Sequence, residues 1–326
     1  SGRGRCGWGE GGGGGVYAPL PMPALGNNVV TALLKRFGFE RDWYLILLGA
    51  AIGTAAALGT IAFSWALHGL EHVLSERRDG LPIWTLPLIP MAGALVTGLL
   101  VTIFAADARG HGVPQVIAAV LRRNGDIPMR VGVVKALASI ATVGTGGSSG
   151  TEGPIVQIGA TFGSVFGRHL RVVREYRPTL VGCGAAAGIA SIFNAPIAGV
   201  FFVLEILLRD FSLRTFTPVV IASVFSAATT QALVNEQNEA IFVVAGELTH
   251  YRFTFRELPS YAVLGLVCGL VAVLYNRVLH GGEELYAKVK LHPVVKPVTG
   301  ALLLGLLGMG YFYAQAAATP EAPPAA

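Results

Sequence analysis

The stretch Gly146-Gly-Ser-Ser-Gly-Thr-Glu-Gly-Pro-Ile155 places one carboxylate, that of Glu152, among glycines within a strongly apolar sequence. Pro154 suits the first turn of a helix, so we expect a helix to begin here. A helix N-terminus carries about half a positive charge and free N–H donors, which attract anions. A lone carboxylate in apolar surroundings is costly unless it faces a partner or a water-filled cavity. The segment therefore predicts an anion site with a built-in anionic competitor.

The composition is that of a membrane protein. Of 326 residues, 53% are hydrophobic and only 13% are charged, and the mean hydropathy is +0.60. A soluble domain carries about 25% charged residues. We therefore expect an all-α polytopic membrane protein that lies in a lipid bilayer.

The charge pattern and the cysteines give no indication of a nucleic-acid-binding protein or of a metalloprotein. The net charge of +5 comes from basic residues scattered in short loops, without a basic stripe interleaved with aromatic residues, so no nucleic-acid partner is expected. Cys6, Cys183 and Cys268 lie far apart, and no Cys/His cluster indicates a metal site. We expect no metal and no cofactor.

Several apolar stretches reach the roughly 20 residues that a helix needs to cross a bilayer. The candidates are Trp43–Leu67, Leu81–Ala106, Phe216–Asn235, Leu258–Asn276 and Pro297–Tyr313, with shorter stretches at Val131–Val143 and Gly153–Gly167. Thr179–Leu204 is also uncharged, but Asn194-Ala-Pro196 interrupts it. Within it, the small residues of Gly182–Ala190 are expected to form a helix-packing surface rather than a ligand surface.

Three places combine glycine and proline inside apolar surroundings: Gly110–Pro114, Gly146–Pro154 and Asn194–Gly199. Such interruptions indicate broken helices that meet at a binding site near the middle of the membrane. The segments 1–28 and 316–326 are rich in Gly, Pro or Ala and are expected to be disordered tails. The arginines of Arg168–Arg177 indicate either a cytoplasmic face or a solvated loop without topological meaning.

Three motifs in order resemble the CLC family of chloride channels and transporters. Gly110-His-Gly-Val-Pro114 resembles the first family signature, Gly-Ser-Gly-Ile-Pro, and Gly150-Thr-Glu-Gly-Pro154 the second, Gly-(Arg/Lys)-Glu-Gly-Pro. The segment from Ala186 to Glu205, with Asn194-Ala-Pro196 inside it, is similar to the family's sequence after the second signature. The resemblance extends roughly from Trp43 to Tyr313.

The resemblance implies a multi-pass homodimer whose subunits each contain a pore made from two inverted halves of tilted, broken helices. Residues 29–315 form the transmembrane domain, with a complete first repeat at 29–250 and the beginning of a second at 251–315. The expected substrate is chloride or a similar small anion, and the expected location is the bacterial inner membrane. No enzyme activity is expected, because Ser148 and Ser149 have no evident base and no His-Glu-x-x-His motif occurs.

By the same resemblance, Glu152 matches the family's gating glutamate, whose carboxylate can occupy an anion position. The alternative is a buried glutamate satisfied by helix-end N–H groups. The expected anion-binding residues are those of the two signatures: Gly110, His111, Gly112, Val113, Pro114, Gly150, Thr151, Glu152, Gly153, Pro154 and Ile155.

The chain departs from the family pattern at two positions. His111 replaces a serine that faces chloride, so its ring either donates to the anion or turns away and leaves coordination to the backbone. Ile206 replaces the inner glutamate of proton-coupled members, and it cannot carry a proton. Glu205, just before it, matches a glutamate with an expected structural role. Lys135 matches a basic position that either raises the pore potential or reaches to an interface.

Two features of relatives, a Gly-x-Phe-x-Pro signature and a late pore tyrosine, are not found in this sequence. We therefore expect this chain to carry half of the anion site and not to conduct alone. The leading hypothesis is chloride transport by a channel-like protein. The alternatives are a proton/chloride antiporter with another proton path, a fluoride/proton antiporter, and a non-conducting truncated membrane protein.

Overall fold

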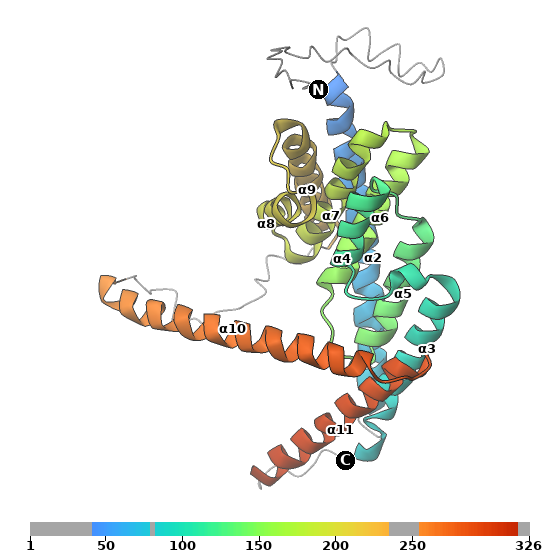
Figure 1. The fold of residues 1–326 in the computed structure, drawn as a ribbon, viewed down its shortest axis with the longest axis vertical. Coiled ribbons are helices and arrows are strands. Elements are labelled where there is room, and N and C mark those ends of the chain that lie inside the picture. The colour runs from blue at the N-terminus through green and yellow to red at the C-terminus, as the bar shows by residue number, and fades with distance from the viewer. Residues whose placement is uncertain (1–40, 79–81, 235–253, 319–326) are drawn as a thin grey trace, which may run out of the picture. The chain divides into compact units, whose positions relative to one another are not determined.

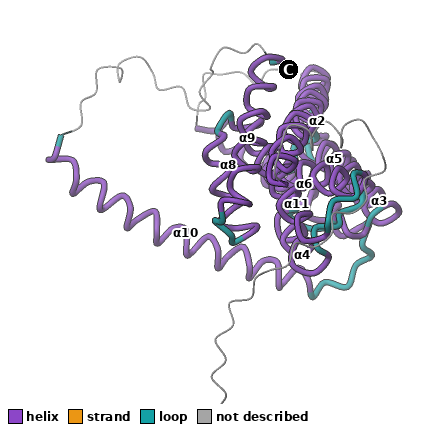
Figure 2. The backbone as a smooth tube through the Cα atoms, turned by 90° about the horizontal axis from the view of Figure 1, so that it is seen from above, coloured by secondary structure: helices purple, strands orange, loops and turns teal. Residues whose placement is uncertain are grey.

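The computed structural model describes residues 41–78, 82–234 and 254–318, and within them it contains helices and no strands (Figures 1 and 2). The predicted tail at 1–28, together with Cys6, lies outside these residues. The predicted tail at 316–326 is partly wrong, because the last helix continues to Ala318. Alanine is the strongest helix former, so Ala316–Ala318 extend the helix.

The first helices correspond to the predicted apolar stretches. Helix α2 spans Arg41–Arg78, and α3 spans Leu88–Phe104 after the short helix η1 at Ile83–Thr85. The apolar part of α2 was expected to end at Leu67. The helix continues for eleven residues because charged side chains end an apolar stretch without breaking backbone hydrogen bonds. The last helices are α9, Leu213–Leu233, α10, Leu258–Ala287 after η6 at Phe255–Glu257, and α11, Val295–Ala318.

The middle of the chain folds into shorter helices, and all three predicted interruptions separate helices. The first interruption lies between the short helix η2, Ala106–Ala108, and helix α4, Val113–Arg123. The second lies between α5, Met129–Val143, and α6, Glu152–His169. After η3, Arg174–Tyr176, helix α7, Arg177–Phe193, ends at Asn194, whose backbone is left-handed with φ 48°. Helix α8, Pro196–Phe202, then continues into η4, a π-helical segment at Val203–Leu208.

Five of the described helical segments are long and apolar enough to cross a membrane: 43–77, 83–104, 213–233, 255–287 and 295–315. Short helices packed among them hold the core. Helix α7 packs on α6, α2 and α9, and α5 packs on α3 and α6 (Figure 1). Residues 179–191 of α7 are all buried. Glycine makes this packing possible: a Cβ on Gly184 would collide with the carbonyl oxygen of Gly159, and one on Gly159 with that of Gly184. The expected packing role of Gly182–Ala190 is confirmed.

Candidate functional site

The two signature segments are in backbone contact. A Cβ on Gly153 would collide with the carbonyl oxygen of His111, and one on Gly112 would collide with the carbonyl oxygen of Gly153. Gly112 also has φ +101°, a conformation that residues with a side chain rarely adopt. Both positions therefore require glycine. The beginning of α4 and the beginning of α6 consequently lie against each other, although 39 residues lie between Gly112 and Glu152 in sequence.

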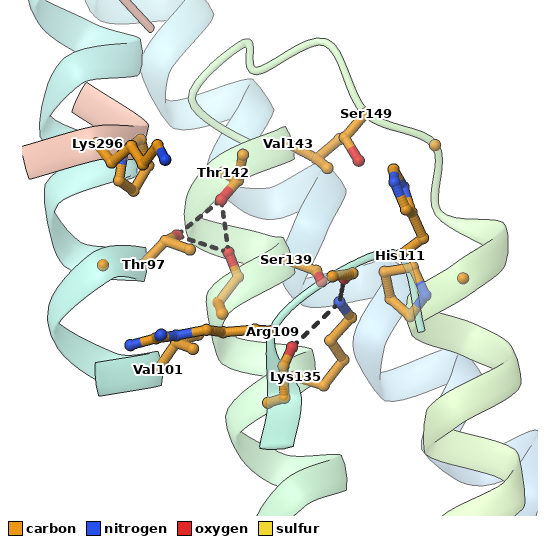
Figure 3. Close-up of a pocket in the computed structure, with 18 of the residues that line it drawn as sticks. Thr97, Val101, Arg109, His111, Lys135, Ser139, Thr142, Val143, Ser149 and Lys296 are labelled. Atoms are coloured by element: carbon orange, nitrogen blue, oxygen red, sulfur yellow. Dashed lines mark hydrogen bonds between the residues drawn. The ribbon is translucent and has the colours of Figure 1, made fainter. Parts of the chain in front are cut away.

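A cavity of about 700 Å³ opens beside this contact. It is bounded by α3, α5, the two signature segments and the residues around the beginning of α11 (Figure 3). Seven of the expected site residues line it: Gly110, His111, Val113, Gly150, Glu152, Gly153 and Pro154. The other four signature positions, Gly112, Pro114, Thr151 and Ile155, are not in the lining, and Ile155 is fully buried in the core.

Glu152 is the first residue of α6 and is exposed toward the cavity. Its carboxylate lies over Gly150, where a Cβ would collide with Oε2. Within the described part of the chain, no hydrogen bond or ion pair holds this carboxylate. The alternative of a buried glutamate held by helix-end N–H groups therefore does not fit this arrangement. A carboxylate without such bonds can move.

Basic groups outnumber this carboxylate in the lining. The lining contains three basic side chains, those of Arg109, Lys135 and Lys296, and one acidic side chain, that of Glu152. The first N–H groups of α6 add partial positive charge, because they have no acceptor inside the helix. A cleft lined by one sign of charge concentrates ions of the opposite sign. The described lining therefore favours an anion.

Lys135 lies inside the structure rather than at an interface. Its side chain, on α5, is only 8% exposed, and Nζ donates to the carbonyl oxygens of Gly110 and, at 3.4 Å, of Ala108. Through its hydrogen bond to Gly110, the lysine ammonium thus stabilises the first signature segment (Figure 3). Two roles were expected for Lys135. Its burial excludes a side chain that reaches to an interface, and the remaining role is a contribution to the positive potential around the site.

The ring of His111, which lines the cavity, also contacts a side chain of α10. Its Nε2 lies 2.9 Å from Oε1 of Glu283 on α10, and the histidine side chain is 74% exposed. The ring nitrogen facing Glu283 is therefore not free to donate to an anion. This geometry corresponds to the expectation in which backbone groups, rather than the ring, face the ion.

Ile206 and Glu205 are not brought to the cavity. Both lie on η4, and neither belongs to the lining. Ile206 is 42% exposed, and Glu205 is exposed without a side-chain hydrogen bond in the described part of the chain. The structural role expected of Glu205 therefore has no contact to support it.

Two groups of polar residues at the site were not identified from the sequence. Gln115 accepts a hydrogen bond from the N–H of Gly112 at 2.8 Å and donates to the carbonyl of Arg109 at 2.6 Å, closing the first signature segment onto α4. A glutamine three residues after the helix-capping position is a recognisable signal for this contact. The other group is a row of hydroxyls on α3 and α5: Thr97, Ser139 and Thr142.

The described chain has helices of membrane length with short helices between them. The N-termini of two helices, α4 and α6, meet beside a cavity with basic residues in its lining. These features define a polytopic membrane protein with a candidate anion site. Comparison gives the family. Residues 92–322 match the model of the voltage gated chloride channel family, and the chain belongs to that family.

Individual relatives agree with this assignment. A ClcB-like chloride channel protein of Ralstonia nicotianae is 32% identical over 277 residues, which are 81% of this chain and 63% of the relative. Chloride channel protein CLC-f of Arabidopsis thaliana is 30% identical over 83% of this chain and 36% of its own length. The chain therefore spans less than two thirds of the length of these relatives.

Two solved structures have the same fold over most of this chain. A slow cyanobacterial Cl⁻/H⁺ antiporter superposes with a TM-score of 0.70 at 22% identity, covering 83% of this chain and 64% of the antiporter. A CLC-type fluoride/proton antiporter gives a TM-score of 0.69 at 28% identity, covering 81% and 64%. The predicted all-α CLC-type fold is confirmed over the matched part.

Proposed function

We propose that this chain contributes to anion transport across a membrane, with chloride as substrate and Glu152 as the gating carboxylate. The observation that carries the proposal is the position of Glu152. It begins α6, faces the cavity without a hydrogen bond in the described residues, and stands among three basic side chains. A carboxylate in that position can compete with an anion, and it can be displaced by the anion or neutralised by a proton.

Passive conduction is the form of transport that the residues favour. Ile206 holds the position of the inner proton-carrying glutamate, and it lies on η4 outside the cavity lining. Proton-coupled exchange of chloride or fluoride is the second candidate, since two structurally similar proteins are proton antiporters. A homodimer in the bacterial inner membrane is part of the same proposal and rests on family membership and on the bacterial relatives.

Glu152→Gln tests the gating assignment. Removing the charge takes away the anionic competitor, so the purified chain should bind chloride more tightly and with less dependence on pH. Calorimetric titration with chloride between pH 4.5 and 7.5 measures both. Glu284→Gln is the matched control, because Glu284 lies exposed on α10 outside the cavity lining. If Glu152→Gln binds with the pH dependence of the unmodified chain, the gating assignment is wrong.

Transport is measured separately, by chloride efflux from liposomes containing the chain. We expect no efflux from this chain alone, since the part that it matches is 63% of the length of the Ralstonia relative. Efflux at rates comparable to those of complete relatives would overturn that expectation. Proton movement during efflux would then decide between passive conduction and exchange.

A further inference from the structure

Three hydroxyls of the cavity lining, on Thr102, Ser139 and Ser149, have no side-chain hydrogen bond in the described part of the chain, and Ser139 is the buried one of the three. Ser139 lies on α5, is only 8% exposed and lines the cavity, and no hydrogen bond to its side chain occurs among the described residues. Figure 3 shows this side chain next to that of Lys135, within the site. The residue is buried, but its oxygen is not among the fully buried side-chain atoms without a partner, so the hydroxyl is accessible from the cavity and can donate to a ligand held there.

Two neighbouring hydroxyls, one on α5 and one just after its end, donate to carbonyls of α5. Thr142 Oγ1 donates to the carbonyl of Ala138 at 2.9 Å, and Thr145 Oγ1 donates to that of Ala141 at 2.7 Å. Thr97 of α3 also donates to Ala138, at 2.9 Å. Ser139 is thus the exception among these hydroxyls, and its proton is not committed to a carbonyl of α5.

Lys135 stands one helical turn before Ser139, so both side chains are on the same face of α5. Its ammonium has three protons, and the carbonyls of Ala108 and Gly110 accept from it. One ammonium proton therefore remains beside the hydroxyl of Ser139. The first signature segment, Gly110-His-Gly-Val-Pro114, contains no hydroxyl side chain, and Nε2 of its histidine is in contact with Glu283.

We propose that Ser139 is a specificity-determining residue of the anion site, donating its hydroxyl proton to the bound anion beside Lys135. This inference rests on the proposed anion-binding function and names a side chain that acts in it. A hydroxyl gives a stronger hydrogen bond to a small anion of high charge density than to a large one. Ser139 consequently favours chloride over thiocyanate.

Ser139→Ala removes the donor with little change in volume. We expect chloride affinity to fall by about tenfold, the lower end of the effect of a hydrogen bond to a charged group. Thiocyanate affinity should fall by less, so the ratio of the two affinities changes. Ser139→Thr keeps a hydroxyl and should retain most of the chloride affinity and of the ratio. Calorimetric titration of the purified full chain with sodium chloride and with sodium thiocyanate measures these values.

Ser223→Ala is a matched control. Ser223 is fully buried on α9, its Oγ also has no hydrogen bond in the described structure, and it is outside the cavity lining. Its substitution should leave both affinities unchanged. An equal loss in Ser223→Ala and Ser139→Ala would show a general packing effect and overturn the proposal.

The two hypotheses fail in different ways. If the unmodified chain binds neither anion, the proposed function fails. If it binds chloride and Ser139→Ala leaves affinity and ratio unchanged, the role of Ser139 fails while the anion site stands. Should Ser139→Ala not fold, Ser139→Thr decides alone: a tenfold loss of chloride affinity with a retained hydroxyl would contradict the proposal.

Discussion

Helices α7 and α10 are both apolar and rich in glycine, yet the structure uses their glycines differently. In α7 the backbone of Gly184 lies so close to Gly159 of α6 that a methyl group cannot be placed between them. In α10 the glycines at 265 and 269 have nothing within 4 Å, and no residue of the helix is buried. The same composition thus serves close backbone packing in one helix and an open apolar surface in the other.

The difference shows what determines each helix. The position of α7 follows from contacts that only glycine permits, whereas α10 is specified by its length and hydropathy, which suit a surface solvated by lipid. Substitutions of the same kind should therefore change stability in opposite directions in the two helices.

Gly184→Ala should have the largest effect. The added methyl group meets the carbonyl of Gly159, and overpacking of a filled interior costs about 3 kcal/mol at the upper end of its range. Unfolding in detergent, followed by circular dichroism against temperature and denaturant, measures the loss.

Gly269→Ala is the paired change in α10. Alanine stabilises a helix interior by roughly 0.5–1 kcal/mol relative to glycine, and this position has open space around it. We expect the free energy of unfolding to rise slightly. If both substitutions destabilise the chain equally, the contrast between the two helices is wrong.

Lys135→Met should lower the free energy of unfolding by about 2 kcal/mol, the next largest loss. It leaves the carbonyls of Ala108 and Gly110 without their donor; Ala108 is buried, and a buried acceptor without a partner costs roughly 1–3 kcal/mol. The first signature segment should then become more accessible to hydrogen exchange. Lys288→Met, at the exposed end of α10, is the control and should leave both stability and exchange unchanged. Equal effects of the two substitutions would contradict the supporting role of Lys135.

Substitution of Asp210, in the loop before α9, should change the free energy of unfolding least. Hydrogen bonds from the hydroxyl of Thr215 and the N–H of Ser212 lower the pKa of its carboxyl below the ordinary value. A lowered pKa in the folded state means that the stabilisation is complete above the unfolded pKa of about 3.9 and is lost as pH falls through the folded pKa.

The stability difference between the unmodified chain and Asp210→Asn should therefore be constant near neutral pH and shrink below about pH 4. Thermal unfolding from pH 3 to pH 7 measures it, and Thr215→Val should reproduce the effect because it removes the same hydrogen bond. A difference that stays constant down to pH 3 would contradict this account.

Much of the fold was predictable because it depends on local signals. Glycine and proline at Gly110–Pro114, Gly146–Pro154 and Asn194–Gly199 identified all three interruptions, since these residues end or begin helices through their own backbone preferences. The extension of α2 beyond Leu67 was missed because hydropathy reports burial in lipid, whereas helix continuation depends on backbone hydrogen bonds.

The site was predictable only in part. The resemblance of the two signatures to those of the family pointed to Glu152 and its neighbours, but contacts between distant segments leave no local pattern. The pairing of His111 with Glu283 joins residues 172 positions apart, and the free hydroxyl of Ser139 can be recognised only when its surroundings are known. Lys296 enters the lining for the same reason, through packing of α11 against α3.

The closure of the first signature segment by Gln115 has a consequence for ion release. Its side chain already takes the N–H of Gly112, so the beginning of α4 offers an approaching ion one donor fewer than an uncapped helix would. Permeation requires binding that is strong enough to admit an ion and weak enough to let it leave. Under the proposed function, the glutamine would limit how tightly this helix end holds an anion and would shorten the time the anion remains there.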